Sequence, residues 1–156
     1  MRFRTEANAY AYILSRNVAG VVPQCYGWFE LDDLLERVRA LPSVLLSGLH
    51  GQDPSITKGL VLEDLVGALR PTVHKISLDF GELALRALHH LHSVYILHGK
   101  PDKDNVLVFP ETMRIVWVGF SHAVCQSAVT RQALLAELAE GWAFIYQRLV
   151  SPLCLS

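Results

Sequence analysis

The stretch that most restricts how this chain can fold is His98–Ala123, which reads HGKPDKDNVLVFPETMRIVWVGFSHA. A dense polar loop comes first, and two apolar, β-rich segments follow, Val106–Phe109 and Ile115–Val118, separated by Pro110–Arg114. This pattern predicts a β-hairpin directly after the loop. Polar groups packed this densely between apolar segments indicate a functional site or the remains of one.

Three segments have apolar residues at the three- and four-residue steps of an amphipathic helix. They are Phe3–Ser15, Ser77–Val94 and Thr130–Leu149. In the second, Asp79 and Glu82 have the spacing of a capping box, which predicts Asp79 as the N-cap. The residues expected to face inward in the third are Leu134, Leu135, Leu138, Trp142, Ile145 and Leu149.

Three further segments predict strands because they are apolar and rich in β-branched and aromatic residues. They are Val21–Phe29, Leu60–Leu65 and the brief Tyr95–Leu97, while Leu31–Leu41 fits either a short helix or a continued strand. A length of 156 residues is that of one domain. The sequence therefore predicts a single α+β domain over residues 1–156.

Charge and hydropathy exclude several classes of protein. The net charge is −1, with Lys and Arg scattered along the chain, so we expect no nucleic-acid binding. Although 51% of the residues are apolar, no apolar run approaches the roughly 18 residues of a membrane helix. The start, MRFRTEANAY, has charges where a signal peptide needs an apolar centre. We expect no membrane partner and an intracellular protein, cytoplasmic or nuclear.

Cysteine and histidine give no metal site by spacing. The three Cys are far apart, which favours reduced thiols over a disulfide framework or a zinc site. Of His89, His90 and His92, only His89 and His92 share a helix face, and no third ligand lies near them in the sequence.

Several short motifs follow one another in the order of the protein-kinase core. They are EANAY at Glu6, LVLEDL, ALHHLHSVYILHG, NVLV and IVWVGFSHA. Over Glu6–Ala123 the chain resembles the protein kinase-like superfamily, and in particular small, divergent kinase-like proteins of fungi. The resemblance implies a truncated kinase-like fold with helix αC, part of the N-lobe sheet and a mainly helical C-lobe. The start of the N-lobe, with its Gly-rich loop, and the late C-lobe would be missing.

The resemblance also implies roles for residues outside the loop. Glu6 resembles the helix αC glutamate, which pairs with a phosphate-binding Lys in active kinases. Leu62 resembles the gatekeeper residue, and Glu63 to Leu65 resemble the adenine-contacting segment. Asn105, Gly119 and Phe120 complete the nucleotide-binding set that the resemblance implies.

The catalytic loop itself departs from the kinase pattern. H-R-D-x-x-x-x-N aligns with the segment from His98 to Asn105 without a gap, but Gly99 replaces the Arg and Lys100 replaces the proton-accepting Asp. Gly119 stands where the D-F-G motif has its magnesium-binding Asp, which leaves Asn105 as the remaining metal ligand.

A neighbouring carboxylate is poorly spaced to replace the lost base. Asp102 lies two residues beyond Lys100, up to about 7 Å away in an extended chain, which exceeds hydrogen-bonding distance. Losing a general base costs about 10²–10⁴ in rate.

The residues that still match the kinase motifs also have structural interpretations. His98 would brace the loop, Asn105 would cap a turn and Phe120 would lie in the core. Asp102, Lys103 and Asp104 would form a solvated turn, and Glu6 would be a surface residue that favours the helix dipole.

The sequence thus favours a degenerate kinase-like domain, a pseudokinase, that binds or scaffolds through uncovered apolar surface, with a protein partner or with itself. Binding of ATP and Mg²⁺ would be weakened or lost. One alternative is an active, atypical ATP-dependent kinase of Ser/Thr in which Asp102 or Asp104 supplies the missing carboxylate. Another is an incomplete gene product of a kinase.

Overall fold

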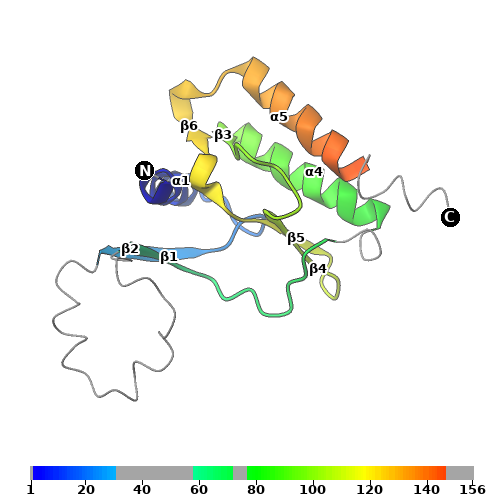
Figure 1. Cartoon of the computed structure of the whole chain (residues 1–156), viewed down its shortest axis with the longest axis horizontal. Coiled ribbons are helices and arrows are strands. Elements are labelled where there is room, and N and C mark those ends of the chain that lie inside the picture. The colour runs from blue at the N-terminus through cyan, green and yellow to red at the C-terminus, as the bar shows by residue number, and fades with distance from the viewer. Residues whose placement is uncertain (1, 31–57, 72–76, 147–156) are drawn as a thin grey trace, which may run out of the picture.

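The structure, a computed structural model, describes residues 2–30, 58–71 and 77–146 (Figure 1). The segment Leu31–Leu41 and the end of the third predicted helix, with Leu149, lie outside the described residues. The elements are α1 (Arg2–Ser15), β1 (Cys25–Glu30), β2 (Lys58–Leu62), α4 (Leu78–Ser93), β3 (Ile96–Leu97), β4 (Val106–Phe109), β5 (Arg114–Trp117), the 3-10 turn η2 (Phe120–His122), β6 (Val124–Cys125), the 3-10 turn η3 (Gln126–Ala128) and α5 (Arg131–Ala143). The protein has the predicted α+β fold.

The described strands form three antiparallel pairs. β4 and β5 make the predicted hairpin, with Val106 opposite Trp117. β1 pairs with β2. The predicted strand Val21–Phe29 begins only at Cys25, and the predicted strand Leu60–Leu65 ends at Leu62. β3 pairs with β6, a contact between two-residue strands that the sequence did not predict.

The helices begin one turn or less from the predicted positions. The N-cap of α4 is Ser77, whose Oγ accepts a hydrogen bond from Phe80 N, so the prediction of Asp79 as the cap is wrong. Asp79 instead lies in the first turn, where its charge favours the helix dipole. α5 begins after Thr130, whose Oγ1 accepts a hydrogen bond from Ala133 N.

α4 and α5 lie side by side, and α4 packs against β5 of the hairpin (Figure 1). A Cβ placed on Gly141 of α5 would lie 2.9 Å from Leu88 Cδ2 of α4, so the glycine permits the close approach of the two helices. The inward face of α5 differs from the prediction. Leu135 and Trp142 are 58% and 51% exposed, whereas Glu137 is buried.

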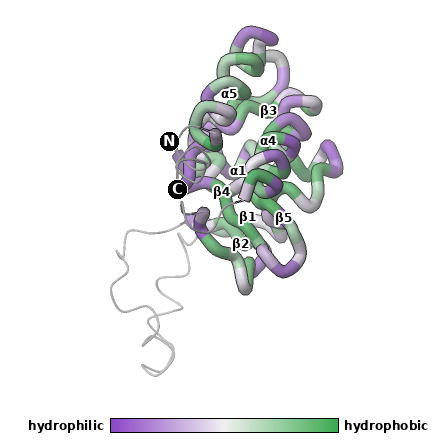
Figure 2. Tube along the Cα trace, turned by 90° about the vertical axis from the view of Figure 1, so that its right-hand side faces the viewer, coloured by the Kyte–Doolittle hydropathy of each residue, from purple (hydrophilic) through white to green (hydrophobic). Residues whose placement is uncertain are grey.

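The core lies between α1, α4 and the β4–β5 hairpin, where hydrophobic segments meet at the centre of the molecule (Figure 2). Trp117 is fully buried there, and its Nε1–H donates to the Ala84 carbonyl over 3.1 Å. This bond fixes the end of β5 against α4, immediately before the segment that contains Gly119. In the part of the chain that the structure describes, no helix is long and apolar enough to span a membrane.

Candidate functional site

His98 begins the polar loop and is completely buried. Its Nε2 lies 2.8 Å from the Val118 carbonyl, and its Nδ1 lies 3.3 Å from the amide nitrogen of Lys100. Because a carbonyl only accepts and an amide N–H only donates, the ring is neutral, with its proton on Nε2. Burial lowers the pKa of His98, in agreement with this neutral form. His98 thus braces the loop, as its structural interpretation predicted.

Glu137 of α5 fixes the first turn of the loop from outside. Its Oε2 accepts from the His98 amide at 2.9 Å and lies 2.7 Å from His92 Nε2, while its Oε1 accepts from the Gly99 amide. Burial alone would raise the pKa of Glu137. The hydrogen bonds from His92, Gly99 and His98 outweigh this effect and lower it. The carboxylate is therefore ionised and has a donor on each oxygen.

The sequence patterns did not identify this role of Glu137. The residue lies between Leu134 and Leu138, two of the residues expected to face inward, but a second carboxylate, Glu140, follows three residues later. His92, considered above only as a metal ligand, is the buried partner of this carboxylate. Among the described residues, no group of three or more His, Cys, Asp or Glu side chains is placed to hold a metal ion.

The interior of the loop is closed by its own side chains. Asn105 Nδ2 donates to the Lys100 carbonyl at 3.0 Å and to Asp102 Oδ1 at 3.1 Å. Asp102 Oδ1 also accepts from the Asp104 amide, and its Oδ2 forms an ion pair with Lys100 Nζ at 3.2 Å. Asp104 is exposed and pairs with Arg70. The two acids of the loop are thus each paired with a cation.

Two glycines in the left-handed region explain two departures from the kinase motifs. Gly99 has φ +80°, and a Cβ there would collide with the backbone carbonyl of His122, so the Arg of H-R-D does not fit. Gly119 has φ +77°, and a Cβ there would lie 2.5 Å from Asn105 Oδ1. A carboxylate at this position requires Asn105 to move.

Glu6 of α1 reaches this same region across the molecule. Its Oε1 accepts a hydrogen bond from the Phe120 amide at 3.1 Å, so the surface interpretation of Glu6 is wrong. Burial raises the pKa of Glu6, partly opposed by this hydrogen bond. The Phe120 ring is fully buried, as predicted for a core residue. It packs against His98 with centroids 4.7 Å apart and edge-on against Tyr10 at 5.4 Å.

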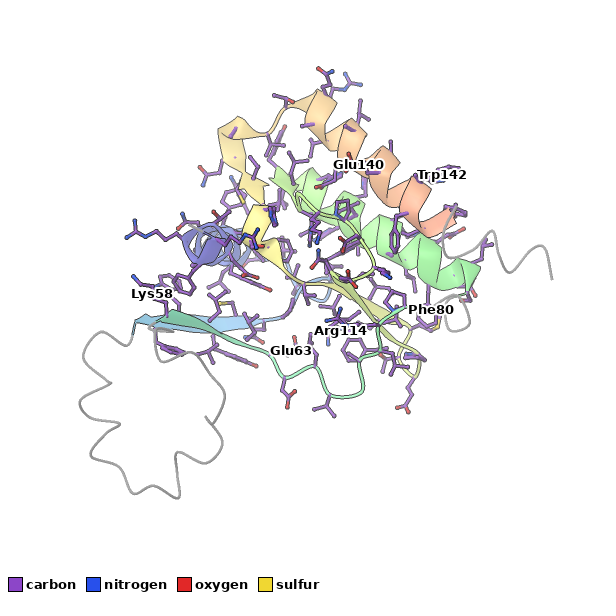
Figure 3. All side chains as sticks on the ribbon, viewed as in Figure 1. Lys58, Glu63, Phe80, Arg114, Glu140 and Trp142 are labelled. Atoms are coloured by element: carbon purple, nitrogen blue, oxygen red, sulfur yellow. The ribbon has the colours of Figure 1, made fainter. Side chains whose placement is uncertain are left out.

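The residues Leu62 to Leu65, which resemble the adenine-contacting part of a kinase, are bonded to or packed against other residues of the chain. Leu62, opposite Cys25 in the sheet, packs against the core. Glu63 forms a two-pronged ion pair with Arg114 of β5 at 2.9 and 3.1 Å, between the β1–β2 sheet and the hairpin (Figure 3). Hydrogen bonding to Arg114 is the main reason that the pKa of Glu63 is lowered. The Leu65 carbonyl accepts from the Ala68 amide in a turn.

The structure therefore brings Glu6, His98, Asn105, Gly119 and Phe120 into one cluster, with Lys100 and Asp102 bonded to its Asn105. The donors present do not fit magnesium. A hard cation is held through carboxylates. Here the Asp102 carboxylate pairs with Lys100 and accepts from the Asp104 amide and Asn105 Nδ2, and the Glu6 carboxylate accepts from the Phe120 amide.

Comparison of the chain with models of known protein families and with curated proteins found no match.

Proposed function

We propose that this chain is a degenerate protein kinase-like domain that transfers no phosphate and acts as a binding or scaffolding module. The observation that carries the proposal is the hydrogen bond from the Phe120 amide to Glu6. It joins the αC-like helix to the D-F-G-like segment, and Phe120 in turn packs on His98 of the catalytic-like loop. Residues that resemble three separate kinase motifs thus contact one another.

Loss of catalysis is supported by Lys100 and Gly119, which stand at the two positions where active kinases have an Asp. Kinase chemistry needs a base near the acceptor hydroxyl and a carboxylate on magnesium. Lys100 and Gly119 supply neither, and Asp102 is occupied by Lys100, Asp104 and Asn105. The same occupation disfavours the alternative of an active kinase that relies on Asp102, and we expect nucleotide and Mg²⁺ binding to be lost.

The proposal is tested by thermal-shift titration with Mg-ATP, followed by an assay of γ-phosphate transfer to a generic protein substrate. We expect neither a shift nor a transfer. Lys100→Asp alone should stay inactive because Gly119 still supplies no carboxylate for magnesium. Lys100→Asp with Gly119→Asp should also stay inactive, because a side chain at residue 119 displaces Asn105. Phosphate transfer by the wild-type protein that is abolished by Asp102→Asn would contradict the proposal and establish the active alternative.

A scaffolding role is supported by an apolar stripe on the outer face of α5. Leu135, Leu138 and Trp142 of α5, and Tyr146 just after it, follow one another at helical steps, and Leu138 and Tyr146 also pack partly against the core. Leu135 and Trp142 are more than half exposed, with Trp142 at the end of α5 (Figure 3). The Trp142 and Tyr146 rings stack with their centroids 5.1 Å apart. Large exposed apolar patches mark sites of association. We name this surface the α5 stripe and propose it as the contact with a protein partner or a second copy of the chain.

Sedimentation of the purified protein tests the α5 stripe. We expect concentration-dependent self-association that Leu135→Ser with Trp142→Ser abolishes. Val66→Ser is the matched control, since Val66 is 79% exposed and lies outside the stripe. A wild-type protein that stays monomeric, or an association that the double variant leaves unchanged, would count against self-association through this surface.

A further inference from the structure

A surface hollow of about 510 Å³ lies where the end of α1 meets the β3–β6 pair. Its size is within the range of roughly 300–1,000 Å³ that is common for small-molecule sites. The residues that line it are Tyr12, Ser15, Arg16, Tyr95, Gln126 and Val129. None of them belongs to the polar loop, so the hollow is separate from the candidate functional site.

The charge of the hollow comes from Arg16, the one charged side chain among the described residues that line it. The Arg16 guanidinium carbon lies 4.9 Å from the centroid of the buried Tyr12 ring, so a cation–π contact holds the guanidinium in place. This contact does not use the N–H donors, which can still bind an anion through two parallel hydrogen bonds. A single cation balances one negative charge, which favours a carboxylate.

Tyr95 and Gln126 line the same hollow with an unusual backbone. Their φ angles of +60° and +65° are left-handed, a conformation that non-glycine residues rarely adopt. The Gln126 amide donates to the Tyr95 carbonyl at 3.0 Å, so the two residues hold each other. Such residues cluster at ligand sites, where the strain serves a purpose.

The identity of residue 95 adds to this argument. Tyr95 follows Val94, the C-cap of α4, at a position where a left-handed residue is usually glycine. The chain has a tyrosine there, although 57% of its surface is exposed and the ring gains little burial to compensate for the strain. The exposed ring is therefore available to pack against an occupant of the hollow.

We propose that this hollow binds a small aromatic carboxylate. The carboxylate would accept two hydrogen bonds from Arg16, and the aromatic ring would lie against the Tyr95 ring and the buried Val129. The site does not depend on the kinase-like assignment. Because Arg16 follows α1 and Tyr95 precedes β3, an occupant would join α1 to the β3–β6 pair.

The test is a pair of NMR titrations of the ¹⁵N-labelled full chain with benzoate and with benzamide, which has the same ring but no charge. Both probes should give saturable shifts of the Gln126 and Val129 amides. Benzoate should bind about fivefold more tightly, on the scale of an exposed ion pair. Added salt should reduce this preference, because it screens the charge of Arg16.

Two arginine variants assign the preference for benzoate. Arg16→Gln removes the cation and should bring the two affinities within about twofold of each other. Arg4→Gln removes an exposed cation near the start of the same helix, outside the hollow, and should preserve the preference. Both arginines are exposed, so both variants should remain folded. Absence of saturable shifts, or a preference for benzoate that persists in Arg16→Gln, would overturn the proposal.

The Tyr95 ring is tested separately from the charge. Tyr95→Gly and Tyr95→Ala both remove the ring and should weaken both probes by about threefold. Glycine adopts the left-handed backbone without strain, so Tyr95→Gly should unfold at a higher urea concentration than Tyr95→Ala and no earlier than the wild type. A Tyr95→Gly variant that binds both probes as the wild type does, or that unfolds before it, would show that the ring serves no ligand.

Discussion

Glu137 shows how one buried carboxylate can organise a loop to which it does not belong. It accepts hydrogen bonds from two consecutive amides, His98 and Gly99, and is paired with His92. A buried charge is tolerated when each of its oxygens is hydrogen-bonded. Without Glu137, two buried donors, from His92 and His98, and the part-buried Gly99 amide would lose their acceptor at once.

We therefore expect Glu137→Ala to lower the free energy of unfolding by about 3 kcal/mol, the scale for breaking a buried pair. Glu140→Ala on the same helix is the control. Glu140 is exposed (Figure 3), and its loss should change stability by less than about 0.5 kcal/mol. Urea unfolding measures both variants. Equal effects of the two substitutions would show that Glu137 does not hold the loop.

At the scale of the elements, the loop and η2 are packed backbone against backbone. Gly99 approaches the His122 carbonyl too closely for any side chain. Gly67 has nearly the same φ, +81° against +80°, but a Cβ there would meet nothing within 4 Å. The two glycines therefore separate the cost of a left-handed backbone from the cost of a steric collision.

Gly67→Ala should destabilise the protein by about 1–2 kcal/mol, the cost of a left-handed non-glycine residue. Gly99→Ala should cost the same amount plus the displacement of η2, for a total above about 3 kcal/mol. Thermal or urea unfolding of both variants gives the difference. Similar losses in the two would mean that the loop can move away from η2 at little cost.

The elements also show which structural features a sequence of this kind reveals. The β4–β5 hairpin was predictable because its apolar segments and turn are adjacent in the chain. The β3–β6 pair was not, since two-residue strands carry too little pattern to indicate a partner far along the chain. Ser77 and Asp79 are both good N-caps, and only the backbone geometry distinguishes them.

The candidate site was predictable in the same uneven way. His98, Asn105 and Phe120 were identifiable because the loop and its flanking strands are local patterns. The contact of Glu6 with Phe120 and the role of Glu137 depend on how helices dock, which leaves no periodic signal in the sequence. Leu135 and Trp142 were expected inside because they are apolar, but the docking of α5 is set by Glu137 and Gly141.

At the scale of the whole molecule, the buried titratable groups set the response to acid. The pKa of His98 is lowered in the folded state. Below about pH 6.5 the unfolded chain therefore binds a proton at His98 more readily than the folded chain does, and the folded state loses stability. The pKa of Glu137 is also lowered, which gives stability above about pH 4.3 that is lost at lower pH. The raised pKa of Glu6 acts in the opposite direction.

Because two groups favour the same direction, we expect the free energy of unfolding to fall as the pH is lowered from 7.5. The first loss should begin near pH 6.5 and the second near pH 4.3. Urea unfolding across this range measures the effect, and the imidazole NMR signals of His98 give its protonation directly. Full protonation of His98 in the folded protein at pH 6 would contradict the neutral form inferred from its hydrogen bonds.

The way in which the polar loop is held has a consequence for protein engineering. Its first turn is fixed by Glu137, and its last residue, Asn105, accepts through its carbonyl from the Val118 amide at 2.8 Å. The exposed Lys103 and Asp104 lie between these supports and contact neither of them, although the Asp104 amide donates to Asp102 Oδ1 and its carboxylate pairs with Arg70. Foreign peptides inserted between these two residues would leave both supports in place, which makes the loop a natural position for displaying a guest sequence.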